Sequence, residues 1–169
     1  MSLQGHNTVV VEYTIRGATI ADAEAIQRHR RAMFADMQYT DAAALDAMSA
    51  HFLPWVRRKM EAGEYMAWLA ISPDGEVRAG LGLWLMDWPP HMLGPGTPRA
   101  NILNVYTERE YRRHGIARDL MLAAIEWCRA HQIRTVILHA SPAGRPLYES
   151  LGFEATNEMR LAFDAKGTG

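Results

Sequence analysis

The sequence predicts a mixed α/β fold, in which helices cover both faces of a mostly antiparallel central sheet. Residues 64–71 and 76–86 are rich in apolar and aromatic side chains and flank the turn sequence Ser72-Pro73-Asp74-Gly75, so they predict an antiparallel hairpin. Between residues 99 and 139 the patterns follow the order strand, helix, strand, which favours a right-handed parallel crossover. With 169 residues, of which 49% are hydrophobic, the chain can form a single domain over residues 1–169 with its own core.

The first half is expected to begin with a strand and two helices. Apolar and polar residues alternate over residues 9–16, which is the period of a half-buried strand. Thr19 and Asp22 resemble a capping box, and a first helix is expected to follow them. Asp41 is the predicted N-cap of a second helix, and we expect Pro54 to interrupt that helix and open a further helical segment.

The second half resumes the strand pattern after a loop. Proline and glycine are concentrated in residues 87–98, and such a segment cannot lie inside a sheet. A strand is predicted over residues 100–107, and apolar residues at helical spacing over 117–128 predict an amphipathic helix. The remaining elements are a strand at 133–139, a short helix, and a last strand at 153–163.

Composition excludes several classes of partner. The formal net charge is -1, so no global field draws the chain to nucleic acid or to anionic lipid. No apolar run reaches the ~18–20 residues that span a bilayer. The N-terminal residues lack the pattern of a secretory signal, which predicts a cytoplasmic location, and residues 1–8 are expected to be flexible.

Cysteine and histidine usage predicts neither a disulfide nor a metal site. Cys128 is the single cysteine, which fits a reducing compartment, and its helical context predicts a small buried apolar residue rather than a nucleophile. The seven histidines show no zinc-like spacing and no cysteine pair beside them, so no metal is expected.

A phosphate-binding cradle is predicted at Arg112-Arg113-His114-Gly115-Ile116-Ala117-Arg118, where a helix begins. The first N–H groups of a helix have no partner within it, and the dipole there is positive. Gly115 lets the backbone approach a bulky anion, and the arginines suit a polyanion. The alternative is that Gly115 is a turn residue and the arginines form a solvated face.

Three sequence blocks carry a resemblance to a known family. Arg112-x-x-Gly115-x-Ala117 resembles the Arg/Gln-x-x-Gly-x-Gly/Ala signature of the GNAT superfamily of acetyl-CoA-dependent N-acetyltransferases. The resemblance extends upstream through Asn104-Val105-Tyr106-Thr107 and downstream through residues 140–153, where a short helix ends in Tyr-x-x-x-Gly-Phe. It covers residues 99–163, the expected cofactor-binding half, and it implies a splayed parallel pair of strands at the cofactor site.

The resemblance implies that main-chain groups bind acetyl-CoA. The splayed strand would hold the pantetheine arm and the cradle would hold the pyrophosphate, while Ser141 lies where many members of the family have Asn. The implied cofactor-binding residues are Val105, Thr107, Arg112, Arg113, His114, Gly115, Ile116, Ala117, Arg118 and Ser141.

Tyr148 matches the tyrosine that in many members of the family donates a proton to the departing CoA thiolate, although it can also be a ring packed in the core. Three carboxylates, Glu108, Glu110 and Glu158, are candidates for a general base, and each can equally be a solvated surface charge. No base is assigned, because members of the family often remove the proton through water.

Acceptor specificity is expected from the loop between the first two helices and from the strands that face it. Aromatic residues there, and at Trp55 and Trp84, are candidates for a pocket that takes a small amine, with core packing or a dimer contact as the alternative use. The substrate candidates are Phe34, Tyr39, Trp88 and Asn104.

The resemblance therefore implies an N-acetyltransferase that moves an acetyl or other short acyl group from acyl-CoA to a primary amine, on a small molecule or a peptide, by direct attack. The alternative from another class is a sensor module of the same fold that binds CoA without turnover. A homodimer is also expected, because the tryptophan-rich segment 84–90 adds apolar surface.

Overall fold

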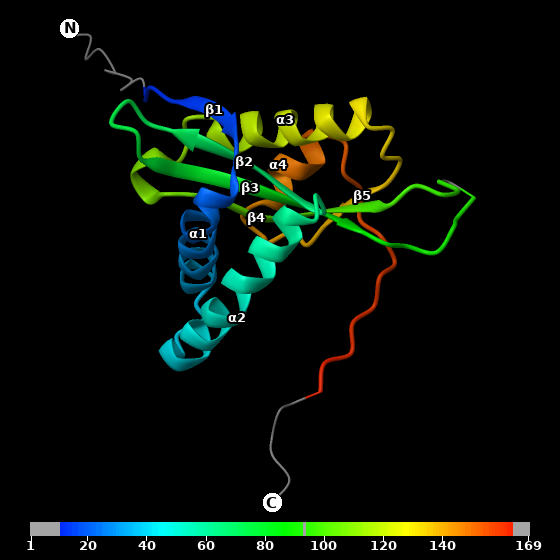
Figure 1. The fold of residues 1–169 in the computed structure, drawn as a ribbon, viewed down its shortest axis with the longest axis horizontal. Coiled ribbons are helices and arrows are strands. Elements are labelled where there is room, and N and C mark those ends of the chain that lie inside the picture. The colour runs from blue at the N-terminus through cyan, green and yellow to red at the C-terminus, as the bar shows by residue number, and fades with distance from the viewer. Residues whose placement is uncertain (1–10, 93, 164–169) are drawn as a thin grey trace, which may run out of the picture. The chain divides into compact units, whose positions relative to one another are not determined.

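The computed structural model describes residues 11–92 and 94–163. Its first unit is built around a central β-sheet (Figure 1). Residues up to His139 form one compact unit and residues from Ala140 form another, and each is described by itself. The segment predicted to be flexible, residues 1–8, lies outside the described residues, as do the first two residues of the predicted first strand.

The sheet has five strands in the order β1-β2-β3-β4-β5. All neighbours are antiparallel except β4 and β5, which are parallel, so the predicted mixed and mostly antiparallel sheet is confirmed. The strands are β1 (Thr14–Gly17), β2 (Tyr65–Ile71), β3 (Val77–Met86), β4 (Arg99–Thr107) and β5 (Val136–Leu138).

Helices lie on both sides of this sheet (Figure 1), as predicted. Helices α1 (Ala23–Asp36) and α2 (Ala42–Glu61) pack against each other and cover one face, and α3 (Ile116–Ala130) packs on β2, β3 and β4 from the other. Two short 3-10 helices, η1 (Ile20–Asp22) and η2 (Arg109–Tyr111), precede α1 and α3. Helix α4 (Arg145–Ser150) belongs to the second unit.

The sequence signals at the first helices and at the hairpin are confirmed. The Asp22 carboxylate accepts a hydrogen bond from the Thr19 N–H at 2.7 Å, which completes the predicted capping box at η1. Asp41 caps α2 by accepting from the Ala44 N–H at 3.1 Å. The turn between β2 and β3 closes through a hydrogen bond from the Gly75 N–H to the Ser72 carbonyl at 2.8 Å.

The predicted interruption at Pro54 is wrong, because α2 runs through it without a break. Proline removes one helical hydrogen bond and crowds the preceding turn. Pro54 faces solvent, while Phe52 and Val56 on either side of it are buried in the core cluster. Burial of these two side chains outweighs the local cost of the proline, so the helix stays continuous.

The predicted last strand over residues 153–163 is also wrong, because the structure forms no strand there. Met159, Leu161 and Phe163 alternate as a strand requires, yet they are 94%, 79% and 87% exposed. A strand needs a neighbour for its backbone groups. The described part of the second unit contains no other strand that could pair with this segment.

An irregularity in β4 opens the sheet where the cofactor is expected. Gly80 pairs with Tyr106 and Gly82 pairs with Leu103, so Leu81 of β3 lies opposite two residues of β4, Asn104 and Val105, which form a β-bulge. Asn104 has φ +57, within the left-handed region. Because β5 pairs with β4 only as far as Ile102, the later residues of β4 have no strand partner on that edge in the described part of the chain.

Candidate functional site

The cradle lies at the start of α3, directly after β4 and η2. Gly115 is the N-cap of α3 and has φ +82, a conformation that suits glycine. A Cβ atom at this position would meet nothing within 4 Å, so the space in front of it is open. The next three N–H groups, of Ile116, Ala117 and Arg118, begin the helix and have no acceptor within it, whereas the Asp119 N–H donates to the Gly115 carbonyl at 3.1 Å. This combination is suited to an anion, as the sequence predicts.

The arginines of the cradle do not all face that space. The Arg112 Nε donates to the Thr107 carbonyl at 2.8 Å, and its guanidinium also pairs with the Asp36 carboxylate. Arg109 donates to the same carboxylate at 2.6 Å. These two arginines hold the pKa of Asp36 below its usual range. Arg112 therefore ties the cradle to β4 and to the end of α1.

Arg113, His114 and Arg118 lie beside the N-cap and retain solvent exposure. Arg113 has φ +68, a backbone conformation that glycine adopts more easily than arginine. Ile116 is buried and Ala117 is half-buried, so their main-chain N–H groups, rather than their side chains, are the groups available to a ligand.

The edge of β4 offers main-chain groups beyond its bulge. Val105 belongs to the bulge and is half-buried. Thr107 pairs with Ala79 of β3, and its carbonyl already accepts from Arg112. Since β5 does not reach this part of β4, the edge can receive an extended ligand arm.

Asn104 points inward from the bulge and is 5% exposed. Its Oδ1 accepts from Arg30 Nη1 at 2.6 Å, and its Nδ2 donates to the Tyr65 hydroxyl at 3.0 Å. Burial raises the pKa of Tyr65, so this phenol stays protonated. Gly82 makes room for it, because a Cβ atom at Gly82 would lie 1.9 Å from the Tyr65 hydroxyl oxygen.

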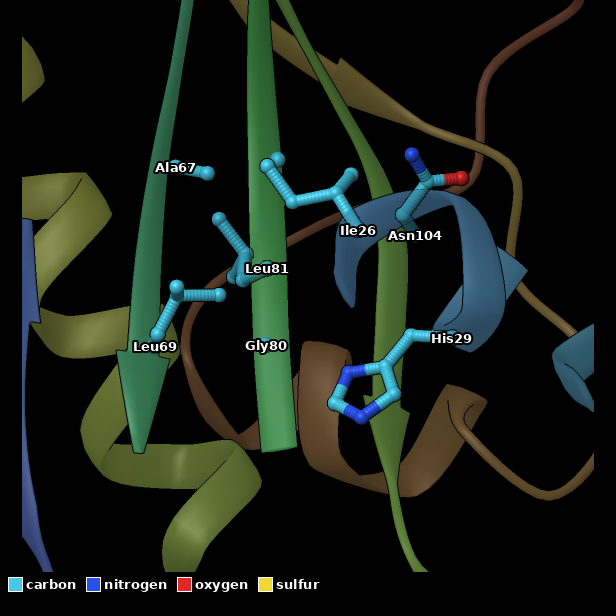
Figure 2. Close-up of a pocket in the computed structure, with 8 residues that line it drawn as sticks. Ile26, His29, Ala67, Leu69, Gly80, Leu81 and Asn104 are labelled. Carbon is cyan, nitrogen blue, oxygen red and sulfur yellow. The ribbon is translucent and has the colours of Figure 1, made fainter. Parts of the chain in front are cut away.

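A small cavity lies between α1 and the sheet, lined by Ile26 and His29 of α1 and by residues of β2, β3 and β4 (Figure 2). Its volume of about 10 Å³ is near the lower limit for one water molecule. His29 is 3% exposed, and neither ring nitrogen has a hydrogen-bond partner in the described part of the chain. The nearest carboxylate oxygen, Oε1 of Glu108, lies 3.7 Å from Nε2.

Burial lowers the pKa of His29, and nearby Arg28 lowers it further, while Glu108 opposes both. The folded protein thus binds this proton more weakly than the unfolded chain, whose histidine titrates near ~6.5. As the pH drops below ~6.5, His29 should lower the free energy of unfolding by up to about 1.4 kcal/mol per pH unit. Above pH ~6.5, His29 should have no effect on the free energy of unfolding.

Urea unfolding between pH 5 and 7 tests this expectation. The His29→Gln variant should lose part of the acid sensitivity, whereas His131→Gln, which changes an exposed ring stacked on Trp127, should keep it. Equal pH profiles for wild type and His29→Gln would contradict the expectation.

The acidic candidates for a general base are engaged or exposed. Glu108 accepts from Arg78 Nη1 at 3.1 Å and is half-buried. Glu110 and Glu158 are exposed. The geometry therefore does not single out a carboxylate that would take the proton.

The aromatic candidates divide between the surface and the core. Tyr39 is 56% exposed and meets the Phe34 ring edge-on at 5.4 Å. Trp88 is 39% exposed, and the Arg99 guanidinium lies 3.9 Å from its ring centroid. Trp55 and Trp84 stack edge-to-face at 5.3 Å against the core cluster, so both contribute to packing.

In the second unit, Tyr148 is buried on α4 beside Phe153. A Cβ atom at Gly144 would lie 2.8 Å from the Tyr148 ring, so this glycine allows the ring to fold back over its own helix start. Burial raises the pKa of Tyr148, which keeps the hydroxyl protonated near neutral pH. Ser141 accepts from the Gly144 N–H at 3.2 Å and organises the turn before α4.

Three residues of α1 were missed by the sequence analysis: His29, Arg30 and Asp36. The first two share the buried side of α1 with Ile26, and a polar residue on an apolar helix face is the signal that could have identified them. Asp36 had no such signal, because its partners come from residues 109 and 112.

Within residues 11–92 and 94–163, no group of histidine, cysteine, aspartate and glutamate could hold a metal ion. In the same residues, no helix has the length and apolar character needed to cross a membrane.

Comparison with known families places this arrangement among acetyltransferases. The family model described as the acetyltransferase (GNAT) family matches residues 24–153. Among curated proteins, none matches the sequence.

Solved structures give the same fold. A GCN5-related N-acetyltransferase from Ralstonia eutropha JMP134 is 35% identical, with a TM-score of 0.82 over 90% of this chain and 99% of that one. A predicted acetyltransferase from Clostridium acetobutylicum, solved with acetyl-CoA, is 22% identical and has a TM-score of 0.80; the match covers 90% of this chain and 96% of that one. A glucosamine-6-phosphate N-acetyltransferase from Arabidopsis thaliana is 15% identical and has a TM-score of 0.66; the match covers 90% of this chain and 99% of that one.

Proposed function

Because the chain belongs to the GNAT acetyltransferase family, we propose that it transfers an acetyl group from acetyl-CoA to a primary amine. The observation that carries the proposal is the N-terminus of α3, where Gly115 has φ +82 and open space at its Cβ position, next to the first helical N–H groups. The β4 edge beyond Ile102, which has no strand partner in the described residues, leads to it.

The residues present fit acetyl-CoA. A pyrophosphate is a bulky dianion, and the cradle offers main-chain donors, the positive end of a helix dipole and the exposed guanidinium of Arg113. The pantetheine arm is a chain of amides, which suits the main-chain groups of β4 from Val105 to Thr107. We propose that Arg112 acts by fixing the cradle on β4, since its guanidinium is bound to Thr107 and Asp36.

Acetyl-CoA supplies an acyl group that is activated as a thioester. In the proposed reaction a main-chain N–H of β4 near the bulge donates to the carbonyl oxygen, where negative charge develops. The neutral amine attacks the carbonyl carbon, and the carbon–sulfur bond breaks. The role that the family resemblance implies for Tyr148 is to donate its proton, or a hydrogen bond, to the sulfur. The amine loses its proton to water, and water returns a proton to Tyr148 where that residue has given up its own.

Direct attack is favoured over an acetylated enzyme because of the state of Cys128. This cysteine is 2% exposed on the buried face of α3, and burial raises the pKa of its thiol to about 11. A buried neutral thiol is a poor nucleophile. Cys128 therefore has the packing role that the sequence predicts.

The test is release of free CoA thiol from acetyl-CoA in a panel of primary amines, with identification of the N-acetylated product by mass spectrometry. We expect at least one amine to give thiol and N-acetyl product in equal amounts. Binding of acetyl-CoA without turnover of any amine would overturn the proposal and favour the sensor module. The cytoplasmic location and the homodimer stay predictions from sequence.

A further inference from the structure

Arg30 lies on α1 between two aromatic rings. Its guanidinium carbon is 4.9 Å from the Phe34 ring centroid and 4.8 Å from that of Phe52. Arg30 Nη1 donates to Asn104 Oδ1 at 2.6 Å. The side chain is half-buried, and its Nε is buried with no acceptor in the described part of the chain. The two rings and Asn104 therefore fix the position of the cation, which makes one hydrogen bond to the described residues through its five N–H groups.

This cation has no carboxylate partner among the described residues, whereas neighbouring arginines do. Arg31, the next residue, donates to Asp46 at 2.7 Å, and Arg57 of α2 pairs with Glu24. Removing a charge from water without a counter-charge is costly. Desolvation accordingly lowers the pKa of Arg30. A counter-charge supplied by a ligand would remove this cost.

Arg30 reaches the bulge of β4 through Asn104, which is where the proposed function places the thioester carbonyl. An amine that attacks there from the α1 side would carry its other substituents toward Arg30. The rings of Phe34 and Phe52 flank the guanidinium, its Nε is buried, and one N–H of Nη1 donates to Asn104, so the remaining N–H groups of Nη1 and Nη2 are the donors left for a ligand. A guanidinium edge binds a carboxylate or a phosphate with two parallel hydrogen bonds.

We propose that the acceptor carries an anionic group, a carboxylate or a phosphate, near its amine, and that Arg30 binds this group. The inference rests on the proposed function, since it assigns a substrate class to the same site. The alternative is that Arg30 only fastens α1 to β4 through Asn104.

The test compares matched acceptors with the wild-type protein. One arm pairs α-amino acids with their neutral α-carboxamides, and the other pairs O-phosphorylated amino alcohols with the free amino alcohols. The measured quantity is kcat/KM for release of the CoA thiol. In the arm that contains the correct anion, we expect this value to be at least about tenfold higher for the anionic acceptor than for its neutral partner, because one charge-assisted hydrogen-bonded pair would give that difference. Equal values in both arms would overturn the inference.

Two substitutions separate recognition from fastening. Arg30→Gln should bring the ratio of anionic to neutral acceptor close to one, and Arg30→Lys, which keeps the charge without the fork, should give an intermediate ratio. Arg31→Gln, on the same helix and paired with Asp46, should keep the wild-type ratio. A purely structural Arg30 would lower turnover of both members equally and leave the ratio unchanged, which would overturn the inference.

Failure of the proposed function gives a different result. If acetyl-CoA binds but neither anionic nor neutral amines release thiol, both the proposed function and this inference are overturned. If neutral amines are acetylated as well as their anionic partners, the proposed function stands and the anion site alone fails.

Discussion

Gly115→Glu should weaken acetyl-CoA binding by well over tenfold, which is a loss of more than ~1.4 kcal/mol. The new carboxylate would occupy the open space in front of the α3 N-terminus, where the main-chain N–H groups are expected to hold the pyrophosphate. It would add repulsion between like charges as well as bulk. Calorimetric titration of acetyl-CoA into wild type and variant measures the change.

A matched control is available at Gly96. This glycine has φ +78 and open space around its missing Cβ, as Gly115 does, but it lies in the loop before β4. Gly96→Glu therefore introduces the same backbone strain and the same charge away from the cradle, and we expect it to keep the wild-type Kd. If folded Gly115→Glu protein also kept that Kd, the cradle would not be the pyrophosphate site.

Tyr148→Phe should lower kcat by roughly 10²-fold, near the lower end of the range for a positioned acid. The variant removes the hydroxyl and keeps the ring, so contacts with Phe153 and Gly144 should persist and the affinity for acetyl-CoA should change little. The raised pKa of Tyr148 means that the wild-type hydroxyl is protonated near neutral pH and available as a donor.

Steady-state kinetics with one productive amine, together with thermal unfolding, separates the two roles of Tyr148. Tyr111→Phe is the control, because Tyr111 offers a ring to Arg78 and is not assigned to the site. Loss of stability with an unchanged kcat for Tyr148→Phe would make this residue a packing group. If no amine is productive and the variant binds acetyl-CoA like wild type, the sensor module is the better account.

The elements predicted correctly are those whose information is local. The hairpin follows from its turn sequence, and α3 follows from an apolar period that places Leu120, Met121 and Ala124 on one buried face. Pro54 misled the prediction because tertiary burial outweighed a local helix breaker. The strand predicted over residues 153–163 is wrong because alternation of apolar and polar residues does not by itself supply a partner strand.

The residues of the candidate site also fall into those that local sequence could indicate and those that depend on contacts between distant parts of the chain. The position of Gly115 at the start of α3 could be predicted from sequence, since a glycine beside arginines just before an apolar helical period is a local signal; its role in binding stays a prediction. The bulge at Asn104 and the pairing of Arg112 with Asp36 could not, because they depend on contacts between residues far apart in the chain. The position of Arg30 against Phe52 also becomes visible only when α1 and α2 pack together.

Amide hydrogen exchange, with and without acetyl-CoA, tests most directly where acetyl-CoA binds. The first N–H groups of α3, at Ile116, Ala117 and Arg118, have no acceptor within the helix, and β5 does not cover β4 beyond Ile102. We predict that saturating acetyl-CoA slows exchange in peptides that span residues 105–107 and 113–118. Calorimetric binding of acetyl-CoA with unchanged exchange in both segments would contradict the account.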